Sequence, residues 1–315
     1  MRNSINFKVS VIMNVHNGEK FISEAVLSVL RQTYQNWELI VWDNKSTDKT
    51  FENVSFFKDK RINYFKSDIF DKLYAARNKA INYSKGDLIT FLDSDDVWLP
   101  NKLEQQVEIM SNKKIDFCYS NYFQIDLNSK KIFPPKAYYK KLPSGKIYKN
   151  LLQNYNVGIL TLCLRKKSLK KFNISFDSRY SIIGDMVFVL ELSKLGFCYA
   201  SQKCLACYRT HQGNLSKKNV LMQVLEMRIW FKELKKVGKW DQLLFKNLED
   251  LTNYQRAKGL LYRTNTSQSL LMIFRIKNIK LTIRFIVHYI IFRIFRKNLF
   301  REKIKFFKKF QFMRK

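Results

Sequence analysis

Residues 86–96 have the sequence Gly-Asp-Leu-Ile-Thr-Phe-Leu-Asp-Ser-Asp-Asp. After the turn glycine, the apolar and β-branched run from Leu88 to Leu92 is typical of a fully buried strand. Three carboxylates, Asp93, Asp95 and Asp96, follow where this strand should end. Neighbouring carboxylates repel one another unless something positive lies between them. In an open α/β sheet, this edge of the sheet is also where ligands bind.

The spacing of the carboxylates indicates a possible cation site. Side chains alternate along an extended segment, so Asp93 and Asp95 should share one face. That arrangement suits Mg²⁺ or Mn²⁺ held by one or two carboxylates together with phosphate oxygens. An acidic turn that caps the next helix, with Pro100 at the helix start, would show the same residues. The spacing alone leaves both interpretations open.

The chain before this stretch alternates between strand and helix patterns. The predicted strands run from Val9 to Val15, Trp37 to Trp42 and Ile62 to Phe65, and the predicted helices from Glu19 to Tyr34 and Tyr74 to Ser84. Ser46 or Thr47 is a candidate N-cap for the helix after the second strand. This alternation with short connections predicts a parallel, doubly wound sheet. Neither G-x-G-x-x-G nor G-x-x-x-x-G-K-[ST] occurs, so dinucleotide and P-loop sites lose their main support.

The second part of the chain is less regular. Phe117 to Ile125 and Val157 to Leu164 predict two further buried strands, Met186 to Lys194 predicts a helix, and Pro134, Pro135, Pro143 and Gly145 mark an irregular basic loop. Cys204 and Cys207 form a lone C-x-x-C, which lacks the second pair that a zinc site needs. Two buried thiols in a strand are the better interpretation.

The cysteine count and the start of the chain bear on the compartment. Five cysteines form no even disulfide framework, which indicates a reducing environment. Residues 1–8 are polar and contain no apolar signal-peptide core, so export is not expected. We expect a cytoplasmic protein.

The net charge of +32 is concentrated at one end of the chain. Residues 251–315 hold 17 Lys and Arg but a single acid, Glu302. Such a balance predicts an anionic partner: a membrane surface, a nucleic acid or a phosphorylated substrate. A general bias toward Lys, Asn, Ile and Phe would raise the charge without any function.

The basic end predicts long helices, since residues 260–315 contain neither Pro nor Gly. One predicted helical stripe holds Lys277, Lys280, Arg284 and His288, and the opposite stripe holds Ile276, Ile279, Ile283, Ile286 and Ile290. After Arg293 the cations move to the face of the isoleucines. The longest uncharged run, Phe285 to Phe292, is far shorter than the ~20 residues of a membrane span. The tail is therefore expected to lie on an anionic membrane, with a helical cap on the core as the alternative.

Three motifs together resemble a known family. They are VSVIMNVHNG from Val9, ELIVWDNKSTDKT from Glu38 and AARNKAINYSKGDLITFLDSDD from Ala75. In order and spacing they resemble the amino-terminal half of family 2 glycosyltransferases of the bacterial surface-polysaccharide type, which have the GT-A fold. Weaker similarity continues through Gly184-Asp185 and Tyr208-Arg209-Thr210-His211. The resemblance implies a mixed, Rossmann-like α/β sheet flanked by helices.

The resemblance also implies roles for individual residues. The implied donor and nucleotide contacts are Asn14, His16, Asn17, Asp43, Asn44, Arg77, Asp93 and Ser94. Asp93, Asp95 and His211 match the positions around a Mg²⁺ or Mn²⁺ ion on the donor diphosphate, with Asp95 as the principal ligand. Asp185 matches the general base that removes the acceptor proton. Without the resemblance, Asp185 would be interpreted as a helix cap and Arg77 as a surface ion pair.

Two positions depart from the family pattern. Gly184 stands where the family usually has Glu before the base, and Asn44 stands where many members have a second Asp. The Gln-x-x-Arg-Trp motif associated with processive relatives does not occur, which favours a single transfer for each acceptor.

The sequence therefore predicts a GT-A domain over residues 1–217 and a basic helical extension over residues 218–315. Within the domain, residues 7–110 should form the nucleotide-binding half and residues 111–217 the acceptor side. The expected activity is metal-assisted, inverting, non-processive transfer of a sugar from a UDP-linked donor to a glycan or lipid-linked acceptor, at the inner face of the cell membrane. The alternatives are an inactive sugar-nucleotide-binding subunit and a basic nucleic-acid-binding protein.

Overall fold

The chain forms two compact units, residues 1–215 and residues 216–315. The computed structural model describes residues 6–132, 141–215 and 219–236, together with a part of residues 250–289. The predicted loop prolines Pro134 and Pro135 and the cations from Arg293 onward lie outside the described residues.

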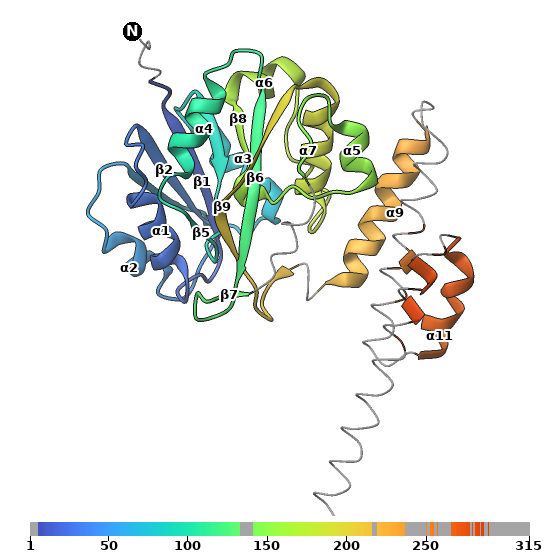
Figure 1. Ribbon diagram of the computed structural model, residues 1–315. Coiled ribbons are helices and arrows are strands. Elements are labelled where there is room, and N and C mark those ends of the chain that lie inside the picture. Colours follow the sequence, from blue (N-terminus) through green and yellow to red (C-terminus); the bar gives the residue numbers. More distant parts are fainter. Residues whose placement is uncertain are drawn as a thin grey trace, which may run out of the picture. The chain divides into compact units, whose positions relative to one another are not determined.

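The first unit is built on one mixed sheet with helices on both faces (Figure 1). Its strands are β1 Val9–Val15, β2 Trp37–Asp43, β3 Ile62–Lys66, β4 Leu88–Phe91, β5 Val97–Trp98, β6 Phe117–Ile125, β7 Lys131–Ile132, β8 Cys163–Arg165 and β9 Cys198–Arg209. The strand order is β3-β2-β1-β4-β8-β6-β9-β5, and β7 pairs with β6. The sequence predicted the first four strands and β6 in nearly these places.

The two halves of the sheet differ in direction. Strands β3, β2, β1 and β4 are mutually parallel, as predicted. Strand β8 then runs antiparallel to both β4 and β6, while β6 and β9 are parallel to each other. The prediction of a wholly parallel sheet therefore holds only for the first half, and the mixed sheet implied by the family resemblance describes the whole.

The helices cover both faces of the sheet. They are α1 Ile22–Leu30, α2 Thr50–Ser55, α3 Leu73–Asn82, α4 Lys102–Met110, α5 Tyr148–Gln153, α6 Lys166–Phe172 and α7 Gly184–Leu195, with the 3-10 turn η1 Ile159–Thr161. The packing of β4 on both faces explains why its sequence is mainly apolar. Leu88 belongs to the core beneath α1 and α4, whereas Phe91 contacts Phe176 and Phe188 on the other side.

Two local predictions are wrong. Ser46 and Thr47 do not cap α2, which begins only at Thr50; the Asp48 carboxylate instead accepts the backbone N–H of Thr50 at 3.1 Å. Val157 to Leu164 is not one strand, because η1 interrupts it before β8. The carbonyl of Leu160 in η1 accepts the indole N–H of Trp98 at 2.9 Å, a bond that no sequence pattern encodes.

A buried acid joins the start of β1, β2 and β4. Glu38 accepts hydrogen bonds from the Ser10 hydroxyl and from the backbone N–H of Lys85, both at 2.6 Å, and pairs with Lys8 at 2.9 Å. Burial raises the pKa of Glu38, but these bonds outweigh it and the pKa is lowered. Gly86 lies in the same place, where an added Cβ would stand 2.6 Å from the backbone of Lys8 and Ser10. The turn glycine is thus required by close packing against β1.

The prediction that Cys204 and Cys207 are two buried thiols in one strand is confirmed in part. Cys204 and Cys207 both lie in β9, Cys207 buried and Cys204 half-buried. All five cysteines are free.

The second unit contains α9 Val220–Lys236, α11 Thr266–Leu271 and the turn η2 Ile273–Arg275 among its described residues. Its small apolar cluster consists of Tyr254, Ala257, Met272, Ile276 and Phe285. Ile276 is buried there and lies outside a helix, so its predicted place on the isoleucine stripe is wrong. Ile279, Ile283 and Ile286 are exposed, whereas Lys280, Arg284, His288 and Ile290 fall outside the described residues. No helix in the described part of the chain is long and apolar enough to cross a membrane.

Candidate active site

The site lies at the carboxyl ends of β1, β2 and β4. Strand register places Val15 beside Asp43 and Ile12 beside Phe91, so the polar residues that follow each strand meet at one edge. Ser94 lies near the turn after β1, because a Cβ added to Gly18 would stand 3.4 Å from the Ser94 hydroxyl. Parallel strands bring together residues that are some 80 positions apart in the chain, roughly as the sequence predicted.

The acidic stretch after β4 is a turn and not an extended segment. The backbone N–H of Asp96 donates to the carbonyl of Asp93 at 3.1 Å. The prediction that Asp93 and Asp95 share the face of an extended strand is therefore wrong. Each of the three carboxylates points to a different group, and each has a different partner.

Asp93 is paired with Arg77 of α3. The guanidinium Nη2 lies 2.5 Å from Asp93 Oδ1. Arg77 is buried, and the rings of Tyr74, Phe91 and Phe176 lie 5.4–5.8 Å from its guanidinium carbon. It is thus not the surface ion pair that the sequence alone suggested, and it holds Asp93 at the edge of the site.

Asp95 faces His211, from the segment after β9. Asp95 Oδ2 lies 2.8 Å from His211 Nε2 and 3.4 Å from the amide nitrogen of Asn214. Asn214 also accepts the backbone N–H of His211 at 2.7 Å, which fixes the histidine segment. Burial, and after it the Asp93 carboxylate, raises the pKa of Asp95, while His211 opposes the rise.

The pair Asp95–His211 fits a divalent cation. Neighbouring ligands of an octahedral ion with bonds of about 2.1 Å lie about 3 Å apart, close to the separation of these two atoms. An oxygen and an imidazole nitrogen are ligands that Mn²⁺ accepts. Among the described side chains, no cluster of three or more His, Cys, Asp or Glu residues is arranged to hold a metal ion. Asp93, the third predicted ligand, pairs with Arg77.

Asp96 is fully buried and lines no ligand space. Its Oδ1 accepts the backbone N–H of Arg209 at 2.8 Å, whereas Oδ2 has no partner among the described residues. Burial and the neighbouring Asp95 and Asp93 carboxylates raise its pKa well above the ordinary value. Asp96 therefore anchors the turn to β9.

Arg209 holds the acidic turn from beneath, a role that the sequence did not predict. Its side chain is fully buried. Nε donates to the carbonyl of Asp95 at 2.8 Å, Nη1 to the Ser129 hydroxyl at 2.9 Å, and Nη2 pairs with Glu24 of α1 at 2.5 Å. The motif Tyr-Arg-x-His contained the signal, since an arginine inside an apolar strand requires buried partners.

The nucleotide side is organised around Asp43. Its carboxylate accepts the backbone N–H of Ser46 at 2.7 Å and the hydroxyl of Tyr64. Asn17, with a positive φ of 53°, accepts the backbone N–H of Thr47 at 2.9 Å. Asn14 is buried, and neither atom of its amide has a partner among the described residues.

Asn44 is occupied by the protein itself. Its amide nitrogen donates to the carbonyl of Asp71 at 2.8 Å, and its oxygen accepts the N–H of Asp71 at 2.9 Å. The carbonyl of Asn44 lies 2.9 Å from His16 Nδ1, and the His16 ring meets Phe70 edge to face at 4.7 Å. Asn44 thus braces the loop between β3 and α3, in place of the free base contact that the resemblance implied.

Asp185 stands in the first turn of α7. Its Oδ1 accepts the backbone N–H of Met186 at 2.8 Å and lies 3.3 Å from the hydroxyl of Tyr74. Burial raises the pKa of Asp185; Arg77 lowers it and Asp93 raises it by smaller amounts. The ion pair Arg77–Asp93 therefore links the surroundings of Asp185 to the acidic turn.

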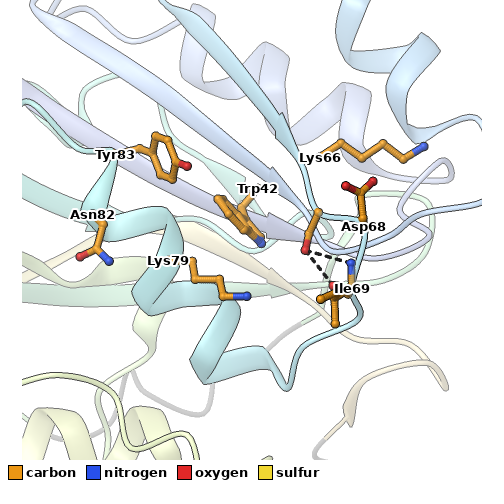
Figure 2. Close-up of a pocket in the computed structure, with 8 residues that line it drawn as sticks. Trp42, Lys66, Asp68, Ile69, Lys79, Asn82 and Tyr83 are labelled. Carbon is orange, nitrogen blue, oxygen red and sulfur yellow. Dashed lines mark hydrogen bonds between the residues drawn. The ribbon is translucent and has the colours of Figure 1, made fainter.

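A groove of about 620 Å³ opens beside α3 (Figure 2). It is lined by Trp42, Lys66, Ser67, Asp68, Ile69, Lys79, Asn82 and Tyr83. None of the predicted site residues lines it. Two of its lining residues, Trp42 of β2 and Lys66 of β3, lie beside Asp43.

Comparison with known proteins now identifies the family. Residues 10–172 match the family described as Glycosyl transferase family 2. The chain is also 36% identical over 243 residues to UDP-Glc:alpha-D-GlcNAc-diphosphoundecaprenol beta-1,3-glucosyltransferase WfgD of Escherichia coli, which covers 76% of this chain and 86% of that protein. The chain belongs to glycosyltransferase family 2.

A second relative and a solved structure are also similar to this chain. The Escherichia coli enzyme WfaP, with the same described activity as WfgD, is 33% identical over 212 residues, covering 66% of this chain and 79% of its own. The crystal structure of S. aureus TarS 1-349 aligns with a TM-score of 0.64 at 19% identity, over 84% of this chain and 78% of that chain. TarS has also been solved with UDP. The structural likeness confirms the GT-A fold, and the family resemblance seen in the sequence is confirmed as well.

The geometry of Arg209 predicts a large effect on stability. Arg209→Lys removes the planar fork that bonds Asp95, Ser129 and Glu24, and a buried ammonium cannot replace all of its hydrogen bonds. We expect the free energy of unfolding to fall by about 1–3 kcal/mol in urea titrations. Arg179→Lys, at an exposed pair with Asp177, should cost less than about 1 kcal/mol. Equal stability of the two variants would contradict this role of Arg209.

Proposed function

We propose that this family 2 glycosyltransferase moves a hexose from a UDP-linked donor to a hydroxyl of a lipid-linked or glycan acceptor, with inversion and once for each acceptor. The observation that carries the proposal is that the Asp95–His211 pair and Asp185 both lie within electrostatic reach of the Asp93 carboxylate, which pairs with Arg77. The Asp95–His211 pair is suited to a cation on a diphosphate, and Asp185 is a carboxylate whose pKa is raised by burial. The described activities of WfgD and WfaP support the donor and acceptor classes.

Asp95 and His211 would hold the cation, and the other coordination positions of the cation would be open to oxygens of the diphosphate. When bound, a divalent cation offsets the negative charge that develops on the leaving diphosphate. Arg77 keeps Asp93 away from this pair, so that a second carboxylate does not repel the incoming phosphate. The turn after β1, with His16 and Asn17, and the turn that Asp43 holds would face the base, where uracil offers an N–H donor between two carbonyl acceptors.

Asp185 would act on the acceptor. Its carboxylate takes the proton of the attacking hydroxyl, while the acceptor oxygen bonds to the anomeric carbon and the bond from that carbon to the diphosphate breaks. A raised pKa makes the carboxylate a better proton acceptor near neutral pH. One carboxylate acting as base in a direct displacement inverts the anomeric configuration.

Family membership weighs against the nucleic-acid-binding alternative, which left the acidic residues unexplained. The inactive-subunit alternative rests on Gly184 and Asn44. Each of these residues has a structural reason, since Asn44 braces a loop and Gly184 accommodates the Tyr74 ring.

The base assignment is tested with Asp185→Asn. The amide keeps the shape but cannot accept a proton at neutral pH, so the transfer rate should fall roughly 10²–10⁴-fold. Binding of UDP-sugar, measured by calorimetry, should stay within about twofold of the unchanged protein. Glu191→Gln on the exposed side of α7 is the matched control and should transfer at the normal rate. A parallel collapse of donor affinity would make Asp185 a binding residue.

The cation assignment is tested with Asp95→Ala. Loss of this ligand should lower the transfer rate at least about 100-fold and remove the dependence of UDP binding on Mn²⁺. Asp68→Ala, an exposed acid outside the site, should leave both unchanged. Full turnover of the unchanged protein in excess EDTA would rule out the cation.

We also propose that the basic end of the chain binds the inner face of the membrane. The exposed side chains of Ile279, Ile283 and Ile286 and the charge of residues 275–315, 14 Lys and Arg against one acid, support this. Each cation close to an anionic bilayer contributes ~1 kcal/mol, and salt weakens that attraction.

Deletion of residues 275–315 tests the membrane proposal. The full chain should sediment with anionic liposomes, less so in high salt, whereas the truncated chain should stay in the supernatant. Transfer to a soluble acceptor should survive, since every proposed site residue precedes residue 217. The deletion also removes Ile276 and Phe285 from the apolar cluster, so an unfolded truncated protein would call for the shorter deletion of residues 290–315 in its place. Retention of nucleic acid in place of liposomes would favour the binding-protein alternative.

A further inference from the structure

Gly184 is required by the side chain of Tyr74. An ideal Cβ at residue 184 would lie 2.4 Å from Cδ2, 2.5 Å from Cε2 and 2.8 Å from Cγ of the Tyr74 ring. The φ of Gly184 is not positive. Glycine is therefore required here because there is no space for a side chain, and not because of its backbone conformation. The ring of Tyr74 thus fills the volume that a side chain before Asp185 would occupy.

The Tyr74 ring has little room to move aside. Tyr74 is buried and stacks on Phe176, with ring centroids 5.7 Å apart and planes at 13°. Phe176 in turn stacks on Phe188 of α7 at 4.0 Å and meets Phe91 of β4 edge to face. Helix α3, β4 and α7 therefore clamp the ring through one aromatic stack.

The hydroxyl at the end of this clamped ring reaches the proposed base. Tyr74 Oη lies 2.9 Å from the carbonyl of Ile182 and 3.3 Å from Asp185 Oδ1. The Ile182 carbonyl precedes α7, and the hydroxyl has one proton to share between the two acceptors. Tyr74 therefore ties the start of α7 and the carboxylate of its first turn to α3.

We propose that Tyr74 is the positioning residue of Asp185, and that its ring and hydroxyl take the place of a polar side chain at residue 184. The proposal rests on the proposed function, in which Asp185 is the base. It also explains how this chain keeps the base while lacking the acid that usually precedes it in the family. The glycine and the tyrosine act as one unit contributed by two helices.

The charged and titratable groups around Asp185 determine what the hydroxyl does. Arg77 of α3 favours the carboxylate, and Asp93 of the acidic turn disfavours it. Tyr155, after α5, is also close enough for Asp185 to raise its pKa, in addition to the larger effect of burial. Against this background, the Tyr74 hydroxyl, 3.3 Å from Asp185 Oδ1, also lowers the pKa of Asp185, by less than Arg77 does. Its removal should raise that pKa, so that the base becomes active only at higher pH.

Tyr74→Phe tests the proposal, because it keeps the ring over Gly184 and removes only the hydroxyl. In the pH profile of kcat, the midpoint of the acid limb should move upward by up to about one pH unit. The plateau should fall roughly 3- to 10-fold because the carboxylate is less well oriented. KM for the UDP-sugar should not change. The midpoint does not depend on the fraction of folded enzyme, so partial misfolding would not hide the result.

Tyr83→Phe, at the other end of α3, is the matched control and should leave the profile unchanged. Gly184→Ala provides a second test, since the added methyl must displace the ring; its plateau should fall at least as far as that of Tyr74→Phe, and adding Tyr74→Ala should not lower it further. An unmoved midpoint in Tyr74→Phe, in an enzyme that Asp185→Asn inactivates, would overturn the inference alone. Normal transfer by Asp185→Asn would instead overturn the proposed function.

Discussion

Three carboxylates within four residues, at the end of a buried strand, set the constraint that shapes this site. Their mutual repulsion is relieved in three directions: Asp93 by Arg77, Asp95 by His211, and Asp96 by the backbone N–H of Arg209. These partners come from α3, from β9 and from the segment that follows β9. The second half of the fold therefore completes the active site that the first half begins.

The sequence predicted what depends on local pattern. The strands β1 and β6 begin and end as predicted; every residue of β1 is buried, and so are residues 117–121 of β6. The approximate place of the site also followed, since the ends of parallel strands must meet. The sequence did not predict features that depend on contacts between residues far apart in the chain or on backbone hydrogen bonds. The acidic stretch closes into a turn, and η1 interrupts a predicted strand beside the Trp98 indole.

Individual roles were harder to predict than positions. Tyr74 is an ordinary residue in the sequence, and its importance appears only when a partner more than 100 residues away is known. The motif around Arg209 carried a signal, but the partners of Arg209 could not be predicted from it. Gly184 seemed to be a loss relative to the family, but its missing side chain is matched by the Tyr74 ring. A departure from a family motif can therefore be compensated from another helix, and a motif comparison along one segment does not detect the compensation.

The double hydrogen bond between Asn44 and the backbone of Asp71 couples the end of β2 to the path of the loop between β3 and α3. A carboxylate at residue 44 could accept the Asp71 N–H but would face the Asp71 carbonyl with no hydrogen to offer. Grafting the more common acid into this protein would therefore release the loop that carries Phe70 toward His16. An exchange of residue 44 between this chain and a relative therefore needs to include residues 67–71, so that the loop keeps its anchor.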